Sequence, residues 1–364
     1  MKKLIAILLA LAMVMAMAAC GSKTEEPAND QNGQKQETEQ KQEQEQEPEA
    51  EPEKEAEAEP EPVEETADVN LYVLAGPTGI GALNLWAAAD AGTAKNNYTV
   101  TMTGANDEIV AALSNGDADI AAIATNLASV LYNKTQGGIS VIAVNTLGVL
   151  YMLSSGETID SIADLAGHTI YSPGEGANPE YILRYVLGGS GLDPDKDVDI
   201  HFVAQGSDLM SVWAEDPSAI IMAPQPVATS LLMQNQGSVE LFNMTDEWNA
   251  ISTDGSALMM GCVVVRNEFL EQHPGAVKTF LEEYKASIEK AVSDTEGTAA
   301  LCESYGIIPK AALAAKALPK CGLTYVDGSE MKAKLSGYLK VMFDANPKSV
   351  GGNLPGDDFY YIAQ

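Results

Sequence analysis

Short apolar runs alternate with longer amphipathic runs along the chain from residue 67 onward. Runs rich in β-branched residues predict strands, and apolar residues three or four positions apart predict helices. In the first part of this region we expect strands at residues 71–74, 98–102, 120–124 and 139–144, and helices that begin at Thr78 and cover 107–113 and 127–134. Strands and helices that alternate through short loops indicate a largely parallel sheet with helices on both faces, which forms one α/β lobe.

A second series of the same kind follows. Its expected strands cover residues 169–171, 200–203 and 219–222, and its expected helices cover 179–187, 209–214 and 227–234. Two further apolar runs, 147–155 and 257–265, bracket this series. They indicate a chain that crosses to a second lobe and later returns. After Arg266 apolar residues recur at helical spacing, so we expect a helical tail that packs back on the first lobe.

The first twenty residues have the pattern of an export signal. Lys2 and Lys3 precede an apolar run from Leu4 to Met17, and two alanines then lead to Cys20. The apolar run is too short for a membrane-spanning helix and has the wrong flanks. A cysteine directly after two alanines resembles the lipobox of bacterial lipoproteins, which implies that Cys20 is lipidated and becomes the mature N-terminus. The alternative is a plain signal peptide in which Cys20 has no such role.

Residues 23–66 consist almost entirely of Glu, Gln, Pro, Ala and Lys, with 17 acidic residues and four lysines. Such a segment cannot bury enough apolar surface to offset its chain entropy, so we expect a disordered tether. About 300 residues follow it, more than one compact core usually holds, which favours two lobes. The expected segments are a lipoprotein signal peptide (1–19), a lipid-anchored acidic disordered tether (20–66), the first part of lobe 1 (67–150), lobe 2 (151–256), and the return to lobe 1 with C-terminal helices (257–364).

The composition is strongly acidic, since 52 Asp and Glu face 21 Lys and Arg and give a formal net charge of −31. This charge argues against nucleic acid and against an anionic membrane surface as partners. The chain has two arginines, Arg184 and Arg266, so an arginine clamp for phosphate or sulfonate has few candidates. The balance leans slightly toward a neutral or cationic ligand, although backbone amides at helix N-termini can also bind anions.

Four cysteines and three scattered histidines show no metal-binding spacing, so we expect neither a metal site nor a cofactor. An exported protein permits disulfides, and Cys302 with Cys321 is the candidate pair, which would contribute about 3 kcal/mol on the chain-entropy estimate. Cys262 lies in the apolar run GCVVV and is expected to be a buried thiol.

The stretch Leu71–Ala91 is the first candidate for ligand contact. An apolar strand ends at Ala75-Gly76-Pro77, and an Ala-rich helical run resumes at Thr78. The first-turn amides of such a helix have no internal partners, and glycines allow a small ligand to approach the backbone. The carboxyl end of a strand is also where ligands bind in α/β sheets. The alternative is a tight turn that needs glycine for its geometry alone.

Several phrases resemble one family when they are taken in order. They are NGDADIA at 115–121, SIADLAGHTI at 161–170, NEFLEQHP at 267–274, and the ending from SVGG at 349–352 to Phe359-Tyr360-Tyr361. Behind a lipobox, this series resembles the solute-binding lipoproteins of ABC importers, and most closely the group of sulfonate, nitrate and thiamine-precursor binders. The resemblance covers about residues 68–364.

The resemblance implies a two-lobed, type 2 periplasmic-binding-protein-like α/β fold. Each lobe would have a mostly parallel sheet flanked by helices, two crossing segments would join the lobes, and a small ligand would lie between them. Matched to this sequence, the expected ligand-binding residues are Gly76, Pro77, Thr78, Gly79, Ile80, Thr125 and Asn126 on lobe 1, Ser172, Gly174, Gly176, Ala177, Asn178, Gln205 and Gln225 on lobe 2, and Tyr151 in a crossing segment. Several have structural alternatives: Asn178 and Thr78 as helix N-caps, and Tyr151 as a hinge-packing residue.

The function that the resemblance implies is an extracytoplasmic solute-binding subunit that delivers its ligand to an ABC permease and its ATPase. The protein would be a monomer, lipid-anchored to the bacterial cell membrane. We expect no catalysis, because the Ser-x-x-Lys match at Ser287–Lys290 lacks its partner motifs and no other catalytic motif occurs. The alternatives are a ligand-binding surface sensor and an enzyme of this fold related to pyrimidine synthesis, whose histidine- and cysteine-rich centre this chain lacks.

Overall fold

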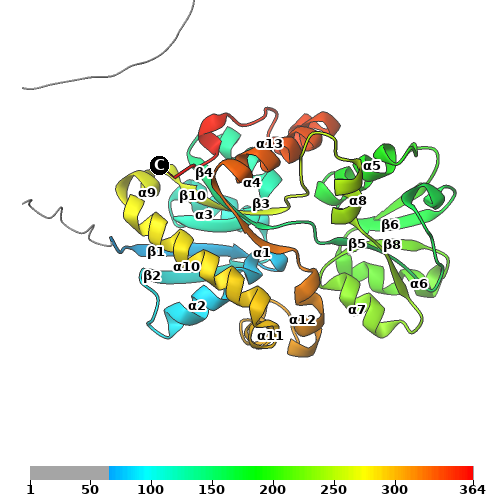
Figure 1. The fold of residues 1–364 in the computed structure, drawn as a ribbon, viewed down its shortest axis with the longest axis horizontal. Coiled ribbons are helices and arrows are strands. Elements are labelled where there is room, and N and C mark those ends of the chain that lie inside the picture. Colours follow the sequence, from blue (N-terminus) through cyan, green and yellow to red (C-terminus); the bar gives the residue numbers. More distant parts are fainter. Residues whose placement is uncertain (1–64, 364) are drawn as a thin grey trace, which may run out of the picture. The chain divides into compact units, whose positions relative to one another are not determined.

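The computed structural model describes residues 65–363. The expected signal peptide, the lipidation site Cys20 and the tether up to residue 64 lie outside the described residues. Within the described range the chain forms two sheets with flanking helices, so the expected α/β fold with two lobes is confirmed. Figure 1 shows the two sheets with their helices.

The first sheet, in lobe 1, has the strand order β11-β4-β10-β3-β1-β2. Strands β1 to β4 run in one direction, whereas β10 and β11 run antiparallel to their neighbours. Every residue of β4 is buried, as expected for a strand that helices cover on both faces. The strands are β1 (Asp68–Leu74), β2 (Asn97–Thr103), β3 (Ile120–Ala124), β4 (Ile139–Thr146), β10 (Gly261–Arg266) and β11 (Leu323–Val326).

The second sheet, in lobe 2, has the order β7-β6-β8-β5-β9. Only β5 runs against its neighbours within this sheet. The strands are β5 (Leu150–Ser154), β6 (Thr169–Pro173), β7 (Asp199–Val203), β8 (Ile220–Pro224) and β9 (Val239–Asn243).

The two sheets share one topology. In the first sheet β2 and β3 lie on either side of β1, and the reversed strand β10 separates β3 from β4. In the second sheet β7 and β8 lie on either side of β6, and the reversed strand β5 separates β8 from β9. The reversed strand is β10 in the first sheet and β5 in the second, and each is the strand in which the chain arrives from the other lobe. Most strands of each sheet run in one direction, as expected. β5 and β10 run the other way because the chain enters each sheet through them from the other lobe.

Helices pack around both sheets as the apolar spacing predicts. Lobe 1 carries α1 (Pro77–Ile80), α2 (Leu83–Asp90), α3 (Asn106–Asn115), α4 (Thr125–Thr135), α9 (Asn267–Gln272), α10 (Pro274–Ser293), α11 (Thr295–Ser304), α12 (Ala311–Ala317) and α13 (Gly328–Ala345). Lobe 2 carries α5 (Asn178–Gly189), α6 (Val212–Glu215), α7 (Val227–Gln234) and α8 (Met244–Ile251). Short 3-10 segments complete the chain: η1 (Ile162–Leu165), η2 (Gly206–Ser211), η3 (Leu318–Lys320), η4 (Pro347–Val350) and η5 (Asp357–Phe359).

Two expected helices differ in detail. The helix expected from Thr78 is interrupted after α1 and resumes at Leu83, and Gly81 lies at the break. A Cβ at Gly81 would lie 3.0 Å from the Tyr284 hydroxyl of α10, so the close approach of α10 explains the glycine. The helix expected at 209–214 is instead the 3-10 segment η2 followed by the four residues of α6.

The largest apolar cluster continues from one lobe into the other. It includes Met152 and Trp248 of lobe 2, Leu258 of the returning segment, and Tyr338 of α13. The Trp248 ring lies 4.2 Å from the Tyr185 ring and 5.6 Å from the Tyr338 ring, measured between centroids. Apolar packing beside the crossing segments thus joins the lobes.

Tyr151 lies in β5 and not in the crossing segment itself, which corrects its expected position. Its hydroxyl donates to the Lys320 carbonyl at 3.0 Å, and the Lys320 ammonium lies 5.7 Å from the ring centroid. Lys320 also pairs with Glu240 of β9. These contacts connect η3 of lobe 1 to two strands of lobe 2, which favours the hinge-packing interpretation of Tyr151.

The candidate disulfide is absent from the structure, because Cys302 and Cys321 are free thiols. Both are fully buried in one apolar cluster with Ile80 and Leu318. Burial raises the pKa of each thiol to about 12, which disfavours the thiolate that disulfide formation requires. Cys262 is a buried thiol, as expected. Within residues 65–363, no helix combines the length and apolar character needed to cross a membrane.

We predict that Gly79→Ala destabilises lobe 1 by about 1–3 kcal/mol, because the added Cβ would lie 2.4 Å from the Leu74 carbonyl oxygen. Gly188→Ala is the control, since a Cβ there meets no atom within 4 Å and alanine favours a helix. Urea denaturation of both variants measures the free energy of unfolding. Equal stability of the two variants would contradict the close approach at Gly79.

Candidate functional site

The expected ligand-binding residues lie at the carboxyl ends of strands. Residues 76–80 follow β1, residues 125 and 126 follow β3, and residues 174–178 follow β6. Gln205 and Gln225 follow β7 and β8, while Ser172 lies within β6. Because these strands run parallel within each lobe, each set gathers at one edge of its sheet, where ligands bind in α/β folds.

The buried side-chain amide of Asn145 holds the loop at the start of α1 in place. Gly76 has a φ of 102°, a conformation that favours glycine. The Asn145 side chain donates to the Thr78 carbonyl at 2.9 Å and to the Tyr284 hydroxyl at 2.8 Å. We did not expect Asn145 or Tyr284 to position this loop. The signal in the sequence is an asparagine directly after the apolar run VIAV in strand β4.

Several lobe 1 residues are used for packing. Ile80 is fully buried in an apolar cluster, and Gly79 is packed against the end of β1. The Thr125 hydroxyl donates to the Met259 carbonyl at 2.6 Å, which fastens α4 to the returning segment. Asn126 donates to the Ser349 carbonyl at 3.3 Å. Among these positions, residues 76–78 are the partly exposed ones at the strand end, together with Asn126.

The loop between β6 and α5 is tightly bonded. Gly174 and Gly176 have φ values of 84° and 68°. The Gly176 N–H donates to the Glu180 carboxylate at 2.6 Å, and the Gly176 carbonyl accepts from the Tyr181 hydroxyl at 3.1 Å. The Ala177 N–H donates to the Gly174 carbonyl at 3.0 Å. Two backbone N–H groups of this loop are therefore already used within the protein.

Asn178 is the first helical residue of α5, and Ala177 is the N-cap, so the alternative of Asn178 as an N-cap is wrong. Asn178 is 6% exposed, and its Oδ1 atom has no hydrogen-bond partner in the described part of the chain. Gln225 is 2% exposed; its Oε1 accepts from Thr229 at 2.7 Å, but its Nε2 has no partner there. An unpaired buried polar group costs about 1–3 kcal/mol. These two amides lie at the ends of the neighbouring strands β6 and β8 and are suited to bonding a ligand.

Gln205 and Ser172 have local roles. Gln205 is exposed, and its N–H donates to the Asp208 carboxylate at 3.0 Å at the start of η2. The Ser172 side chain is fully buried and donates to the Pro173 carbonyl. Neither contact points to a ligand.

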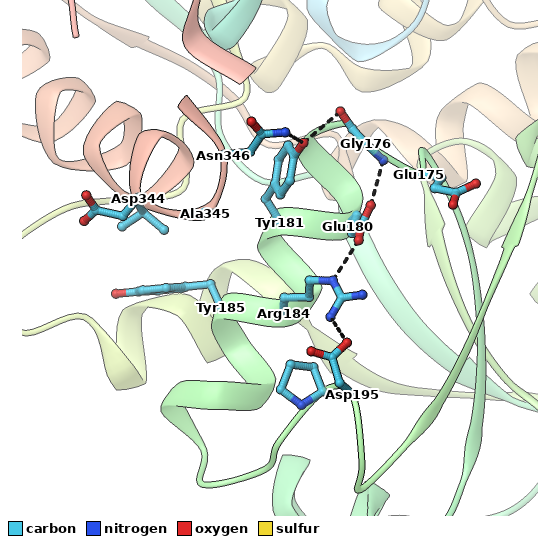
Figure 2. Close-up of a pocket in the computed structure, with 12 residues that line it drawn as sticks. Glu175, Gly176, Glu180, Tyr181, Arg184, Tyr185, Asp195, Asp344, Ala345 and Asn346 are labelled. Atoms are coloured by element: carbon cyan, nitrogen blue, oxygen red, sulfur yellow. Dashed lines mark hydrogen bonds and ion pairs between the residues drawn. The ribbon is translucent and has the colours of Figure 1, made fainter. Parts of the chain in front are cut away.

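A cavity of about 730 Å³ lies beside α5 (Figure 2). One wall comes from the β6–α5 loop, α5 and the segment around Asp195, and the other from the C-terminal end of α13. The Asn346 amide after α13 donates to the Tyr181 hydroxyl at 2.9 Å, so the two lobes meet at this cavity. Gly176 is the one expected site residue that lines it. The sequence pattern did not indicate the cavity, because α5 and α13 lie about 150 residues apart.

A comparison with protein families finds that the family described as NMT1/THI5 like matches residues 100–297, more than half of the chain. The chain belongs to the NMT1/THI5-like family. This NMT1/THI5-like chain matches none of the curated proteins compared with it. The residues described contain no cluster of three or more His, Cys, Asp or Glu that could hold a metal ion.

Solved structures share the fold of this NMT1/THI5-like chain. An ABC transporter structure from Parabacteroides distasonis gives a TM-score of 0.68 at 22% identity, over 81% of this chain and 99% of that one. The periplasmic aliphatic sulphonate binding protein SsuA from Escherichia coli gives 0.65 at 14% identity, over 82% and 92%. A ligand binding component of an ABC-type import system from Staphylococcus aureus, with zinc bound, gives 0.59 at 14%, over 82% and 97%. The expected periplasmic-binding-protein-like fold is thereby confirmed.

We predict that Asn178→Ala leaves the free energy of unfolding of the ligand-free protein within about 0.5 kcal/mol or raises it, because the substitution breaks no hydrogen bond. Asn145→Ala, the matched control, should cost about 2–3 kcal/mol, since it removes three hydrogen bonds and leaves Tyr284 unpaired. Urea denaturation measures both. A loss at Asn178 as large as that at Asn145 would mean that Asn178 has a structural role.

Proposed function

We propose that this protein is the extracytoplasmic solute-binding subunit of an ABC importer, which captures a small molecule between its lobes and delivers it to a membrane permease. The observation that carries the proposal is the pair of buried, unpaired amides at Asn178 and Gln225, at the strand edge where α/β folds bind ligands. Buried polar groups normally have partners, so a pair without them fits a site that a ligand completes. Membership of the NMT1/THI5-like family and the shared fold of import-system binding proteins support the same function.

The contacts between the lobes fit a hinged capture mechanism. Near the crossing segments the lobes share an apolar cluster and the Tyr151–Lys320 contact. At the start of α5, a hydrogen bond from Asn346 to Tyr181 adds to this packing. A ligand that bonds both lobes would add to the contacts of the closed form and shift the equilibrium toward closure. Binding without chemistry is the role that these residues support.

We also infer that the protein acts as a lipid-anchored monomer on the outer face of the bacterial cell membrane. The lipobox-like sequence at Cys20 supports the anchor, and the acidic segment 23–66 would space the lobes from the membrane. Its partners would be the permease and the ATPase of the importer. Sulfonates, nitrate and thiamine precursors are the first ligand classes to test, because family resemblance suggests them.

We predict that one class of solute stabilises the purified protein in a thermal-shift screen of sulfonates, taurine, nitrate, thiamine-pathway pyrimidines, flavins, amino acids and polyamines. A ligand at one hundred times its dissociation constant adds about 2.7 kcal/mol, which raises the melting temperature by roughly 5 °C. X-ray scattering should show a smaller radius of gyration with the same ligand. The variant Asn178→Ala should lose the shift while keeping its ligand-free melting temperature. A shift that survives in this variant would place the solute elsewhere.

We predict that Cys20→Ser moves the protein from the detergent phase to the aqueous phase when it is expressed in a bacterium and partitioned in Triton X-114. The reason is that a serine cannot carry the thioether-linked lipid that holds the mature protein in the membrane. Ser22→Ala changes a neighbouring residue and should stay in the detergent phase. Aqueous partitioning of the unsubstituted protein would contradict lipidation.

A further inference from the structure

The cavity beside α5 has the size and walls of a small-molecule site. Its volume of about 730 Å³ falls within the 300–1,000 Å³ typical of ligand pockets. Figure 2 shows that α5 supplies one wall, with Tyr181, Arg184 and Tyr185, and that Ala345 and Asn346 at the end of α13 supply the facing wall. Because both lobes line it, a molecule held there would contact both.

Two groups at this cavity that could bind an anion, the Arg184 guanidinium and the Gly176 N–H, are already engaged. The Arg184 guanidinium donates to Glu180 and to Asp195, each at 2.7 Å (Figure 2). At the N-terminus of α5, the Gly176 N–H is taken by Glu180, and Pro179 has no N–H. An anion would have to displace a carboxylate to reach either of these two groups.

The charge of the lining is negative instead. Four carboxylates, those of Glu175, Glu180, Asp195 and Asp344, face one guanidinium. Two of them neutralise Arg184, and Asp344 pairs with Lys340 at 2.6 Å. Glu175 has no ion-pair or hydrogen-bond partner among residues 65–363 and remains available to a positive group on a ligand.

One observation independent of the carboxylates points to the same class of ligand. The rings of Tyr181 and Tyr185 line the cavity, and aromatic faces attract cations.

We propose that this cavity takes an organic cation with an apolar body, whose ammonium group lies toward Glu175 and the β6–α5 loop and whose body lies against Tyr185. The inference rests on the proposed function, because it names the charge class of the captured solute. It is also separable from that function, since a protein that captures an anion would still be a solute-binding subunit.

The test uses three probes of similar shape and different charge: 2-phenylethylammonium, 2-phenylethanol and 3-phenylpropanoate. Isothermal titration calorimetry of the full chain at low salt should give the highest affinity for the ammonium probe. Glu175→Gln should weaken that affinity about threefold, and Glu175→Gln/Asp344→Asn about tenfold. Glu215→Gln, an exposed acid on α6 outside the cavity, removes the same charge and should leave the affinity unchanged.

A second pair of variants tests the aromatic wall. Tyr185→Leu should weaken binding of the ammonium probe about threefold, whereas Tyr185→Phe, which keeps the ring, should not change it. Equal affinity for the three probes, preference for 3-phenylpropanoate, or no measurable binding of the ammonium probe would overturn the proposal. A sulfonate or nitrate that gives the thermal shift and the closure described above would overturn it too, while leaving the importer function standing.

Discussion

The structure depends on the chain crossing between the lobes twice. Each crossing delivers a strand that enters a sheet between two strands running the opposite way, so β5 is inserted antiparallel beside β8 and β10 antiparallel beside β3. These positions are interior, and both strands are almost completely buried. Neither lobe can complete its sheet without the chain that comes from the other. The returning segment also lies beside the candidate ligand site of lobe 1, because the Thr125 N–H donates to the Met260 carbonyl where α4 begins.

The buried amides show how the two lobes divide stability and binding. In lobe 1, Asn84, Asn96 and Asn145 all have partners, and these bonds join α2, the residue before β2, and β4 to α10. In lobe 2, Asn178 and Gln225 each keep an unpaired atom. A partnered amide stabilises its surroundings, whereas an unpaired one costs free energy until a ligand bonds it. The contrast fits a lobe 1 that serves as a scaffold and a lobe 2 that carries much of the recognition.

The periodicity of the sequence was enough to predict the two series of elements, the crossings and the helical tail, because these depend on local apolar spacing. It placed the candidate residues at strand ends for the same reason. It did not show that Ile80 packs in an apolar cluster with Cys302, or that the Thr125 hydroxyl bonds the Met259 carbonyl, since these partners lie far along the chain. The cavity between α5 and α13 escaped prediction because its walls meet only when the tail docks on lobe 2. The candidate disulfide failed because spacing carries no information on how an apolar cluster buries two thiols.

Charge connects the cavity to the rest of the molecule. The chain has 52 acidic residues, so an unpaired carboxylate such as Glu175 is by itself unremarkable on its surface. Glu175 differs from the others because it lines a cavity whose one guanidinium, that of Arg184, is already bonded to two other carboxylates. Two tyrosine rings line the same cavity. The Asn346–Tyr181–Gly176 series of hydrogen bonds also runs from lobe 1 to the loop that carries Glu175. A ligand that pairs with Glu175 would therefore bind a loop that is already connected to lobe 1 by hydrogen bonds.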